Sequence, residues 1–276
     1  MPKPRLINRR PGRGAAIALG AVPFAVLAAA YLIGSDIRLD ANPNDKLLPP
    51  LDRIGAAIER LAFTPDRRTG DYLLWSDTWA SLRRLLTGLA IAAGIGLAGG
   101  IAIGLIPRVR ATLAPVVAVL SLIPPLAVLP ILFIVFGLGE VSKVVLIVVG
   151  IAPFLIRDLA QRVSEIPTEQ IVKAQTLGAS TWQIVTRVAL PQSLPHLVGS
   201  VRLALGPAWL FLIASEAIAA TGGLGYRIFL VRRYLAMDVI LPYVAWITLL
   251  AFLLDHLLKR LSQRGFKWAH ADGSGL

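Results

Sequence analysis

Cysteine is absent from the 276 residues, and charged residues make up only 16% of them, well below the quarter that is usual for soluble domains. Without cysteine, neither a disulfide nor a thiolate metal site can form. The chain also lacks a glycine-rich phosphate loop followed by Lys-Ser/Thr, a cluster of histidines and a Ser-His-Asp set. We therefore expect no metal, no cofactor and no ATP bound by this chain, and no enzymatic activity of its own.

Apolar residues are abundant instead, at 56% of the chain, and the mean hydropathy is +0.70. Several apolar runs approach or exceed the ~20 residues that a helix needs to cross a bilayer. The sequence therefore predicts an all-α, polytopic membrane protein with about six transmembrane helices. The net charge of +12 is then explained by basic residues that flank the spans and set their orientation, rather than by nucleic-acid binding.

The pattern predicts a basic tail (1–13), a first span (14–34), a polar external segment with an amphipathic helix (35–82), a core of five spans (83–260) and a second tail (261–276). The core spans are expected at Leu85–Ile106, Leu113–Leu138, Val141–Leu159, Leu194–Ala220 and Val239–Leu258. The positive-inside rule places both termini in the cytoplasm. Arg83 and Arg84 violate the rule, and we expect them at the outer interface. Arg232 and Arg233 violate it without an explanation.

Small residues within the spans indicate where helices pack against each other, and polar residues there are candidates for a structural or transport role. Gly96, Gly100 and Gly104 repeat every four residues, which lets a neighbouring helix approach closely. Arg202 is close enough to the cytoplasmic end of its span to reach water. Glu216 lies near the outer end of the same span, where it either reaches water or faces the interior; a structural or gating role is favoured over substrate contact.

The third span contains the stretch SLIPPLAVLP (121–130). Prolines at membrane depth leave backbone carbonyls without partners, so this stretch is either a broken helix beside a transport path or a simple kink. Candidates for residues along such a path are Ser121, Pro124, Pro125, Pro130, Trp209 and Glu216.

The polar stretch 167–191 is predicted to form two short helices. Thr168 follows Pro167 as a helix start, and Gly178 is a stop. Ser180 and Gln183 fit a capping box for the second helix, and Pro191 is expected to end it. A helical period then places Trp182, Val185, Val188 and Ala189 on one face, as an apolar ridge.

Within this stretch, Gly178, Val188, Leu190 and Pro191 resemble the "EAA" loop of ABC-importer permeases. Val172, Lys173 and Ala174 stand where that family usually has Glu-Ala-Ala, so the family's glutamate has no counterpart here. The runs IPPLAVLPILFIVFGLGEVSK (123–143) and RLALGPAWLFLIASEAIAATGGLG (202–225) resemble the nitrate/sulfonate/taurine branch of these permeases.

The resemblance implies a type I ABC importer permease fold in a bacterial inner membrane. It also implies two permease copies, here a homodimer, two cytoplasmic ATPase subunits that bind ATP and Mg²⁺, an external substrate-binding protein, and alternating access. The loop would be the coupling helix, and its contact residues would be Ala174, Leu177, Gly178, Ala179, Ser180, Trp182, Val185, Val188, Leu190 and Pro191.

The branch handles small polar solutes such as nitrate, sulfonates and taurine. The runs 42–50 and 234–250 resemble relatives that go with urea or guanidine utilisation, so a small nitrogen compound is an alternative substrate. A stand-alone ion-coupled transporter is the alternative function, although the chain shows no inverted repeat. A third possible function is that of a membrane scaffold or assembly protein without a transport path, but the prolines of the third span argue weakly against it.

Overall fold

The computed structural model describes residues 11–67 and 69–270, and every regular element within them is a helix. The elements are α1 (Arg13–Ala41), α2 (Leu51–Ala62), α3 (Leu73–Leu105), α4 (Pro107–Leu120), α5 (Pro125–Phe136), α6 (Glu140–Ser164), α7 (Thr168–Thr176), α8 (Thr181–Ile184), a π turn (Val185–Ala189), α9 (Leu190–Ala219), α10 (Leu224–Arg232), α11 (Met237–Gly265) and a short 3₁₀ turn (Lys267–His270). The predicted all-α class is confirmed. Residues 1–10 of the predicted basic tail, Arg68 and residues 271–276 of the second tail lie outside the described part.

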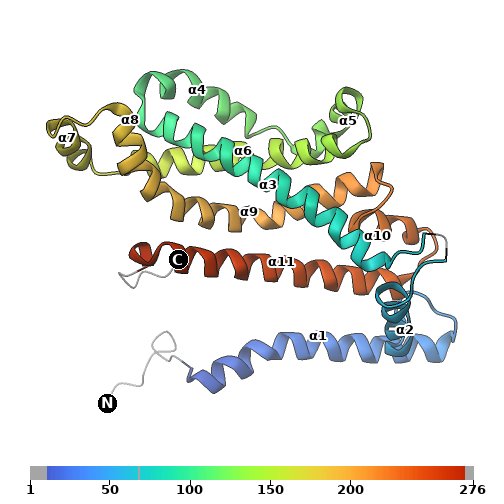
Figure 1. Cartoon of the computed structure of the whole chain (residues 1–276). Coiled ribbons are helices and arrows are strands. Elements are labelled where there is room, and N and C mark those ends of the chain that lie inside the picture. The colour runs from blue at the N-terminus through green and yellow to red at the C-terminus, as the bar shows by residue number, and fades with distance from the viewer. Residues whose placement is uncertain (1–10, 68, 271–276) are drawn as a thin grey trace, which may run out of the picture.

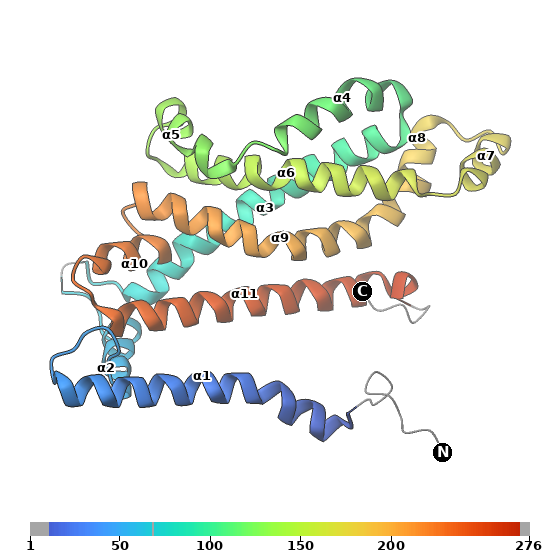
Figure 2. The ribbon, with the colours of Figure 1, turned by 180° about the vertical axis from the view of Figure 1, so that it is seen from behind.

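Five stretches are long and apolar enough to cross a membrane: α1, α3, α6, the continuous stretch Thr181–Ala219, and α11. α4 and α5 pass the same test as a pair, but they are bent by 94° at the break between them. Figures 1 and 2 show α3, α6 and α9 at the centre of the molecule, with α4 and α5 on one side and α11 and α1 on the other.

The break in the third predicted span decides between the two interpretations of its prolines. The helix stops at Leu120 and resumes at Pro125, so the span is broken rather than kinked. Pro124 and Pro125 have no backbone N–H to donate, and a residue that precedes proline is driven toward an extended backbone. Pro124 serves as the N-cap and Pro125 as the first residue of α5, positions where a missing N–H costs nothing.

Several helices are longer than the sequence predicts. α3 begins at Leu73 rather than at Leu85, and α1 continues to Ala41 instead of ending at Gly34. The predicted boundaries at 83 and 261 therefore fall inside α3 and α11. The added turns contain polar residues that the hydropathy pattern excludes from a span. Asp77, Ser81 and Arg84 in the added turns of α3 are buried in the structure.

The three regularly spaced glycines bring α3 against α6. A methyl group on Gly96, Gly100 or Gly104 would lie 2.6, 2.5 or 2.4 Å from the Cβ of Leu155, Leu159 or Val163, respectively. Such distances are too short for real side chains, so the contact exists only because these positions are glycine. Helices in lipid associate by packing of this kind, since lipid tails are as apolar as the side chains.

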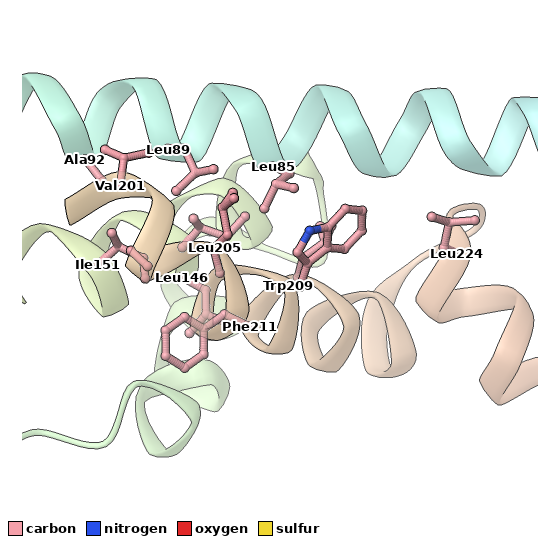
Figure 3. Packing of buried hydrophobic residues seen from close by; sticks show 14 of the residues in the cluster. Leu85, Leu89, Ala92, Leu146, Ile151, Val201, Leu205, Trp209, Phe211 and Leu224 are labelled. Carbon is pink, nitrogen blue, oxygen red and sulfur yellow. The ribbon is translucent and has the colours of Figure 1, made fainter. Parts of the chain in front are cut away.

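The main apolar core joins α3 and α6 to α9. Figure 3 shows how the side chains interdigitate there. The labelled residues are Leu85, Leu89 and Ala92 of α3, Leu146 and Ile151 of α6, Val201, Leu205, Trp209 and Phe211 of α9, and Leu224 of α10. The core therefore extends from the central helices to the start of α10.

α1 lies apart from the central helices in both views (Figures 1 and 2), and none of its most apolar window is buried. Hydrogen bonds at one end hold it to the segment that leads into α2. Tyr31 donates to the carbonyl of Pro49 at 2.5 Å, and Ser35 donates to that of Leu48 at 2.9 Å. Arg38 donates to the carboxylate of Asp45 at 2.5 Å.

We predict that Gly100→Ala destabilises the protein by about 1–3 kcal/mol, because the added methyl overpacks the contact with Leu159. Gly94→Ala is the matched control, since a Cβ at that position meets nothing within 4 Å. The control should be neutral or slightly stabilising. Thermal unfolding in detergent measures both, and equal melting temperatures for the two variants would contradict the close contact.

Candidate functional site

The segment between α6 and α9 forms a knob, defined here as residues 167–189, which contains α7, α8 and the π turn. In Figure 1 it lies at one end of the molecule, and α10 and α2 lie at the opposite end. The beginning of α1 and the end of α11 are at the same end as the knob (Figures 1 and 2). The knob is therefore well placed to contact a partner beyond the end of the spans.

Local hydrogen bonds fix the turn between the two short helices of the knob. α7 begins at Thr168, and Gly178 adopts a φ of +80°, which glycine tolerates best. The backbone N–H of Ala179 donates to the carbonyl of Ala174 at 3.0 Å. The predicted capping box is confirmed: Gln183 N–H donates to Ser180 Oγ at 3.3 Å, and Ser180 N–H donates to Gln183 Oε1 at 2.7 Å.

The prediction that Pro191 ends the second helix is wrong. The chain continues from α8 through the π turn into α9 without a break, as the stretch Thr181–Ala219. Pro191 lies in the first turn of α9, after the π turn has altered the hydrogen-bond register. Proline is tolerated at such a position because its missing N–H has no required partner there.

The predicted apolar ridge of the knob is divided between two faces. Trp182 and Leu177 are 72% and 80% exposed, respectively. By contrast, Ala189 is fully buried, and Val185 and Leu190 pack with it against a small cluster formed by α3 and α6. A regular helical period placed these side chains on one face, but the π turn rotates them inward. Val185 and Leu190 therefore anchor the base of the knob, and the exposed apolar surface is formed mainly by Trp182 and Leu177, with Val172 of α7 beside them in the knob.

The other predicted coupling residues lie around the same turn. Gly178 and Ser180 are exposed, whereas Ala174, Ala179 and Val188 are half-buried. A hydrogen bond from Gln192 Nε2 to Gln170 Oε1 (3.1 Å) also ties α7 to the start of α9. The knob is thus a rigid unit that presents a large apolar side chain on each side of Gly178.

The candidates for a transport path fall into two groups. Ser121, Pro124, Pro125 and Pro130 lie on or beside the break between α4 and α5, while Trp209 and Glu216 lie in the interior of α9. Ser121 Oγ accepts a hydrogen bond from Arg157 of α6 at 2.7 Å.

A cavity of about 260 Å³ between α3, α4 and α6 adjoins this contact. Arg157 and Arg110 both line it. Arg110 donates to the carbonyls of Ile103 and Gly104 at the end of α3. Two guanidinium groups therefore face a cavity beside the broken helix.

Glu216 is the centre of a buried polar network. Its side chain is fully buried, and it accepts from Ser81 Oγ at 2.8 and 2.9 Å and from Arg84 at 2.6 Å. It also accepts from the backbone N–H of Gly225 at 2.8 Å. Arg84 in turn donates to the carboxylate of Glu140 at 2.6 and 2.7 Å. The expectation that Arg84 lies at the outer interface is therefore wrong: a charge inside the bundle needs a partner, and Arg84 has two.

Asp77 forms the second half of this network. It accepts from Arg227 of α10 at 2.8 Å, from Tyr243 of α11 at 3.0 Å and from the backbone N–H of Gly223 at 2.9 Å. Burial is the largest single influence and would lower the pKa of the Arg227 guanidinium, but the hydrogen bond to Asp77 and the attraction of the Asp77 charge, with a smaller effect of Tyr243, together raise that pKa. Arg227 therefore remains charged, and the network joins α3, α9, α10 and α11.

Two further polar contacts cross between helices. Arg202 forms a bidentate pair with Asp255 of α11 at 2.8 and 3.0 Å, and both side chains remain partly exposed. Ser200 donates to Asp158 of α6. The indole N–H of Trp209, by contrast, is buried and has no hydrogen-bond partner within the described residues.

Sequence reasoning missed most of the network because it began the second span at Leu85. Asp77, Ser81 and Arg84 are spaced by four and three residues, which places them on one face of a helix. That spacing was the available signal, because polar residues on one face of a membrane helix face its neighbours. Their partners on α10 and α11 have no comparable signal in the sequence.

Residues 81–266 match a family described as "binding-protein-dependent transport system inner membrane component". The chain belongs to this family. It is 42% identical over 199 residues to the taurine transport system permease protein TauC of Escherichia coli, which covers 72% of each chain. It is 34% identical over 202 residues to the bicarbonate transport system permease protein CmpB of Synechococcus elongatus, again covering 72% of each. The resemblance to the nitrate/sulfonate/taurine branch is thereby confirmed.

Solved structures agree with the permease fold. A chain of the inward-facing MetNI methionine ABC transporter aligns with a TM-score of 0.63 and 25% identity, covering 70% of this permease and 96% of that chain. A chain of a bacterial alginate ABC transporter shares the fold, with a TM-score of 0.60 and 14% identity, covering 89% and 96%. The family match starts at residue 81, so α1, α2 and the first turns of α3 precede it.

We predict that Ser180→Ala increases amide hydrogen exchange in α8 about fivefold, because loss of an N-cap costs ~1 kcal/mol. Thr186→Ala is the control: its hydroxyl only donates to the Trp182 carbonyl within the helix. Exchange followed by mass spectrometry compares peptides from the knob. Unchanged exchange in the Ser180 variant would contradict the role of the capping box.

Proposed function

We propose that this permease is the membrane subunit of an ATP-driven importer that moves a small polar solute into the cytoplasm by alternating access. The observation that carries the proposal is the knob, with Trp182 and Leu177 exposed on a turn that is fixed by Gly178 and a capping box. Exposed aromatic side chains on a rigid element are typical anchors of a protein interface. A separate ATPase subunit is the proposed partner of this surface.

The arrangement of charge supports a cytoplasmic position for the knob and for both termini. Basic residues gather at that end, on the helix ends and on the knob itself: Arg108, Arg157, Arg162, Lys173, Arg187, Lys259, Arg260 and Arg264. At the opposite end, the charges of Arg84 and Arg227 are paired with carboxylates. Pairing removes part of the conflict with the positive-inside rule. Arg83, Arg232 and Arg233 are exposed at that end, as are the basic residues around α2: Arg38, Lys46, Arg53, Arg60 and Arg67.

The proposed assembly contains two copies of this chain, two ATPase subunits and an external substrate-binding protein. The family description names a binding-protein-dependent system, which supports the last of these. ATP-driven closure of the ATPases would move the two knobs and open the spans outward, and hydrolysis would reset them.

The substrate that we propose is a small solute with an anionic group, such as a sulfonate. The relatives TauC, SsuC of Bacillus subtilis and CmpB are named for taurine, aliphatic sulfonates and bicarbonate. All three compounds are small and carry a negatively charged oxyanion group. A soluble binding protein that selects the solute would refine this choice further.

We predict that Trp182→Ala weakens retention of the ATPase roughly thirtyfold, because loss of an interface anchor costs about 2 kcal/mol. Gly178→Pro should also uncouple ATP hydrolysis from uptake, since proline cannot adopt the observed φ of +80°. Co-purification from detergent and uptake by reconstituted vesicles measure these effects.

Trp79→Ala is the matched control, because Trp79 is 70% exposed on the first turns of α3, at the other end of the molecule. It should retain both the ATPase and uptake. Normal coupled uptake by both knob variants, or a purified wild-type chain that transports without any ATPase, would overturn the proposed function.

A further inference from the structure

The start of α10 is held by side chains from other helices. Its N-cap is Gly223, which has no side chain with which to cap the helix itself. The backbone N–H groups of Gly223, Leu224 and Gly225 donate to Asp77, Ser81 and Glu216 at 2.9, 2.9 and 2.8 Å, and the carbonyl of Gly222 accepts from Arg84 at 2.8 Å. Four consecutive residues thus bond through their backbones to side chains of α3 and α9.

These contacts match what a helix N-terminus requires. The first N–H groups of a helix have no partner within it, and carboxylates there are stabilised by the helix dipole. In most helices one capping side chain from the same segment satisfies them. In α10, the caps come instead from two separate helices: Asp77 and Ser81 belong to α3, and Glu216 belongs to α9.

The fit around this turn is tight. Gly223 has a φ of +125°, and a Cβ on it would lie 2.6 Å from the Glu216 carboxyl group. A Cβ on Gly225 would lie 2.7 Å from the carbonyl oxygen of Ile213 in α9. The caps therefore reach the backbone only when α3, α9 and the turn are in register, and a shift between α3 and α9 would leave buried donors without acceptors.

We propose that Asp77, Ser81 and Glu216 are positioning residues that hold α10 as a gate at the end of the permease opposite the knob. The gate is closed while α3 and α9 keep their present relation, and it is released when they move apart. The inference rests on the proposed function for its place in transport. Its structural part, the dependence of α10 on caps from two helices, is independent of any partner.

Glu216→Gln tests the gate with little change in volume. Glu216 accepts from Ser81, Arg84 and Gly225, all of which are donors. A glutamine amide has only one oxygen, and its NH₂ group must face at least one of these donors. The buried site has no water exposure to relieve that conflict, so the variant should release the start of α10.

Glu140→Gln is the matched control. Glu140 also accepts from Arg84, but its side chain is half-exposed and it forms none of the four bonds to residues 222–225. Ser81→Ala is a milder variant that keeps every charge and removes the cap of Leu224 together with the hydrogen bond from Ser81 to Glu216. It keeps the test decisive if the Glu216 variant does not fold.

Because the chain has no cysteine, a single introduced thiol reports on one position. Val231→Cys places the thiol on α10, where Val231 is partly buried against the core. Leu97→Cys is the reference, since Leu97 is partly buried near the knob. The full chain in lipid nanodiscs is labelled with a maleimide, and the rates are measured for the wild-type background and for the three variants.

We expect Glu216→Gln to raise the labelling rate at position 231 about tenfold, the factor that corresponds to one buried hydrogen-bonding group left unsatisfied. Ser81→Ala should raise it about threefold, while Glu140→Gln and the reference thiol should stay unchanged. Equal rates at position 231 in all backgrounds, or an equal rise at both reporter positions, would overturn the proposal.

The role in transport is tested on the complex with its ATPase. Trapping that complex with a non-hydrolysable ATP analogue should raise the labelling rate of Val231→Cys in the otherwise wild-type chain and leave it high in the Glu216 variant. If the wild type transports but the labelling rate at position 231 is the same with and without the analogue, the gate is overturned and the proposed function remains intact. Absence of any ATP-driven uptake by the wild type would instead contradict the proposed function, with the thiol result in nanodiscs still valid.

Discussion

The ion pair between Arg84 and Glu216 is the interaction on which the packing of the spans depends. A charge left alone in the interior of a membrane protein costs at least ~2.5–3.5 kcal/mol, so each of these side chains fixes the position of the other. Arg84 is on α3 and Glu216 is on α9, and the same two residues bond to the turn that begins α10. The arrangement of three helices at this end therefore follows from one buried pair and its neighbours, whereas the middle of the bundle is held by apolar contacts.

The middle of the bundle is held by close packing, and its two ends are held by hydrogen bonds. Along α3 and α6, glycines meet leucine and valine side chains so closely that there is no room for a Cβ. At the two ends, hydrogen bonds replace this packing: the capping box and Gln170–Gln192 pair in the knob, and the carboxylate caps at α10. A hydrogen bond can be exchanged for another when helices shift. The close contact between a glycine and the side chain facing it has no such substitute. The end at α10 is thus the part of the bundle that can change most readily when α3 and α9 shift.

The sequence predicts the all-α class, the close approach at Gly100 and the two helices around Gly178, because each depends on local periodicity or on a single residue type. It fails where distant segments decide the outcome. Hydropathy began the second span at Leu85 and so left out Asp77 and Arg84, since Arg227 and Glu216, far along the chain, make their burial possible. It also placed Val185 and Ala189 beside Trp182, because a π turn has no signature in the pattern. Pro124 and Pro125 allowed either a kink or a break, and the choice required the surrounding helices.

The π turn has a mechanical consequence. Because α8 continues through it into α9, Trp182 and Glu216 lie near the two ends of one uninterrupted helical rod of 39 residues, Thr181–Ala219. At 1.5 Å per residue, this rod is roughly 60 Å long. The helix can bend along this length at the π turn and at Pro195 and Pro207. Trp182 of the knob and the buried carboxylate of Glu216 are therefore joined by one continuous helix, and the backbone path between them contains no loop.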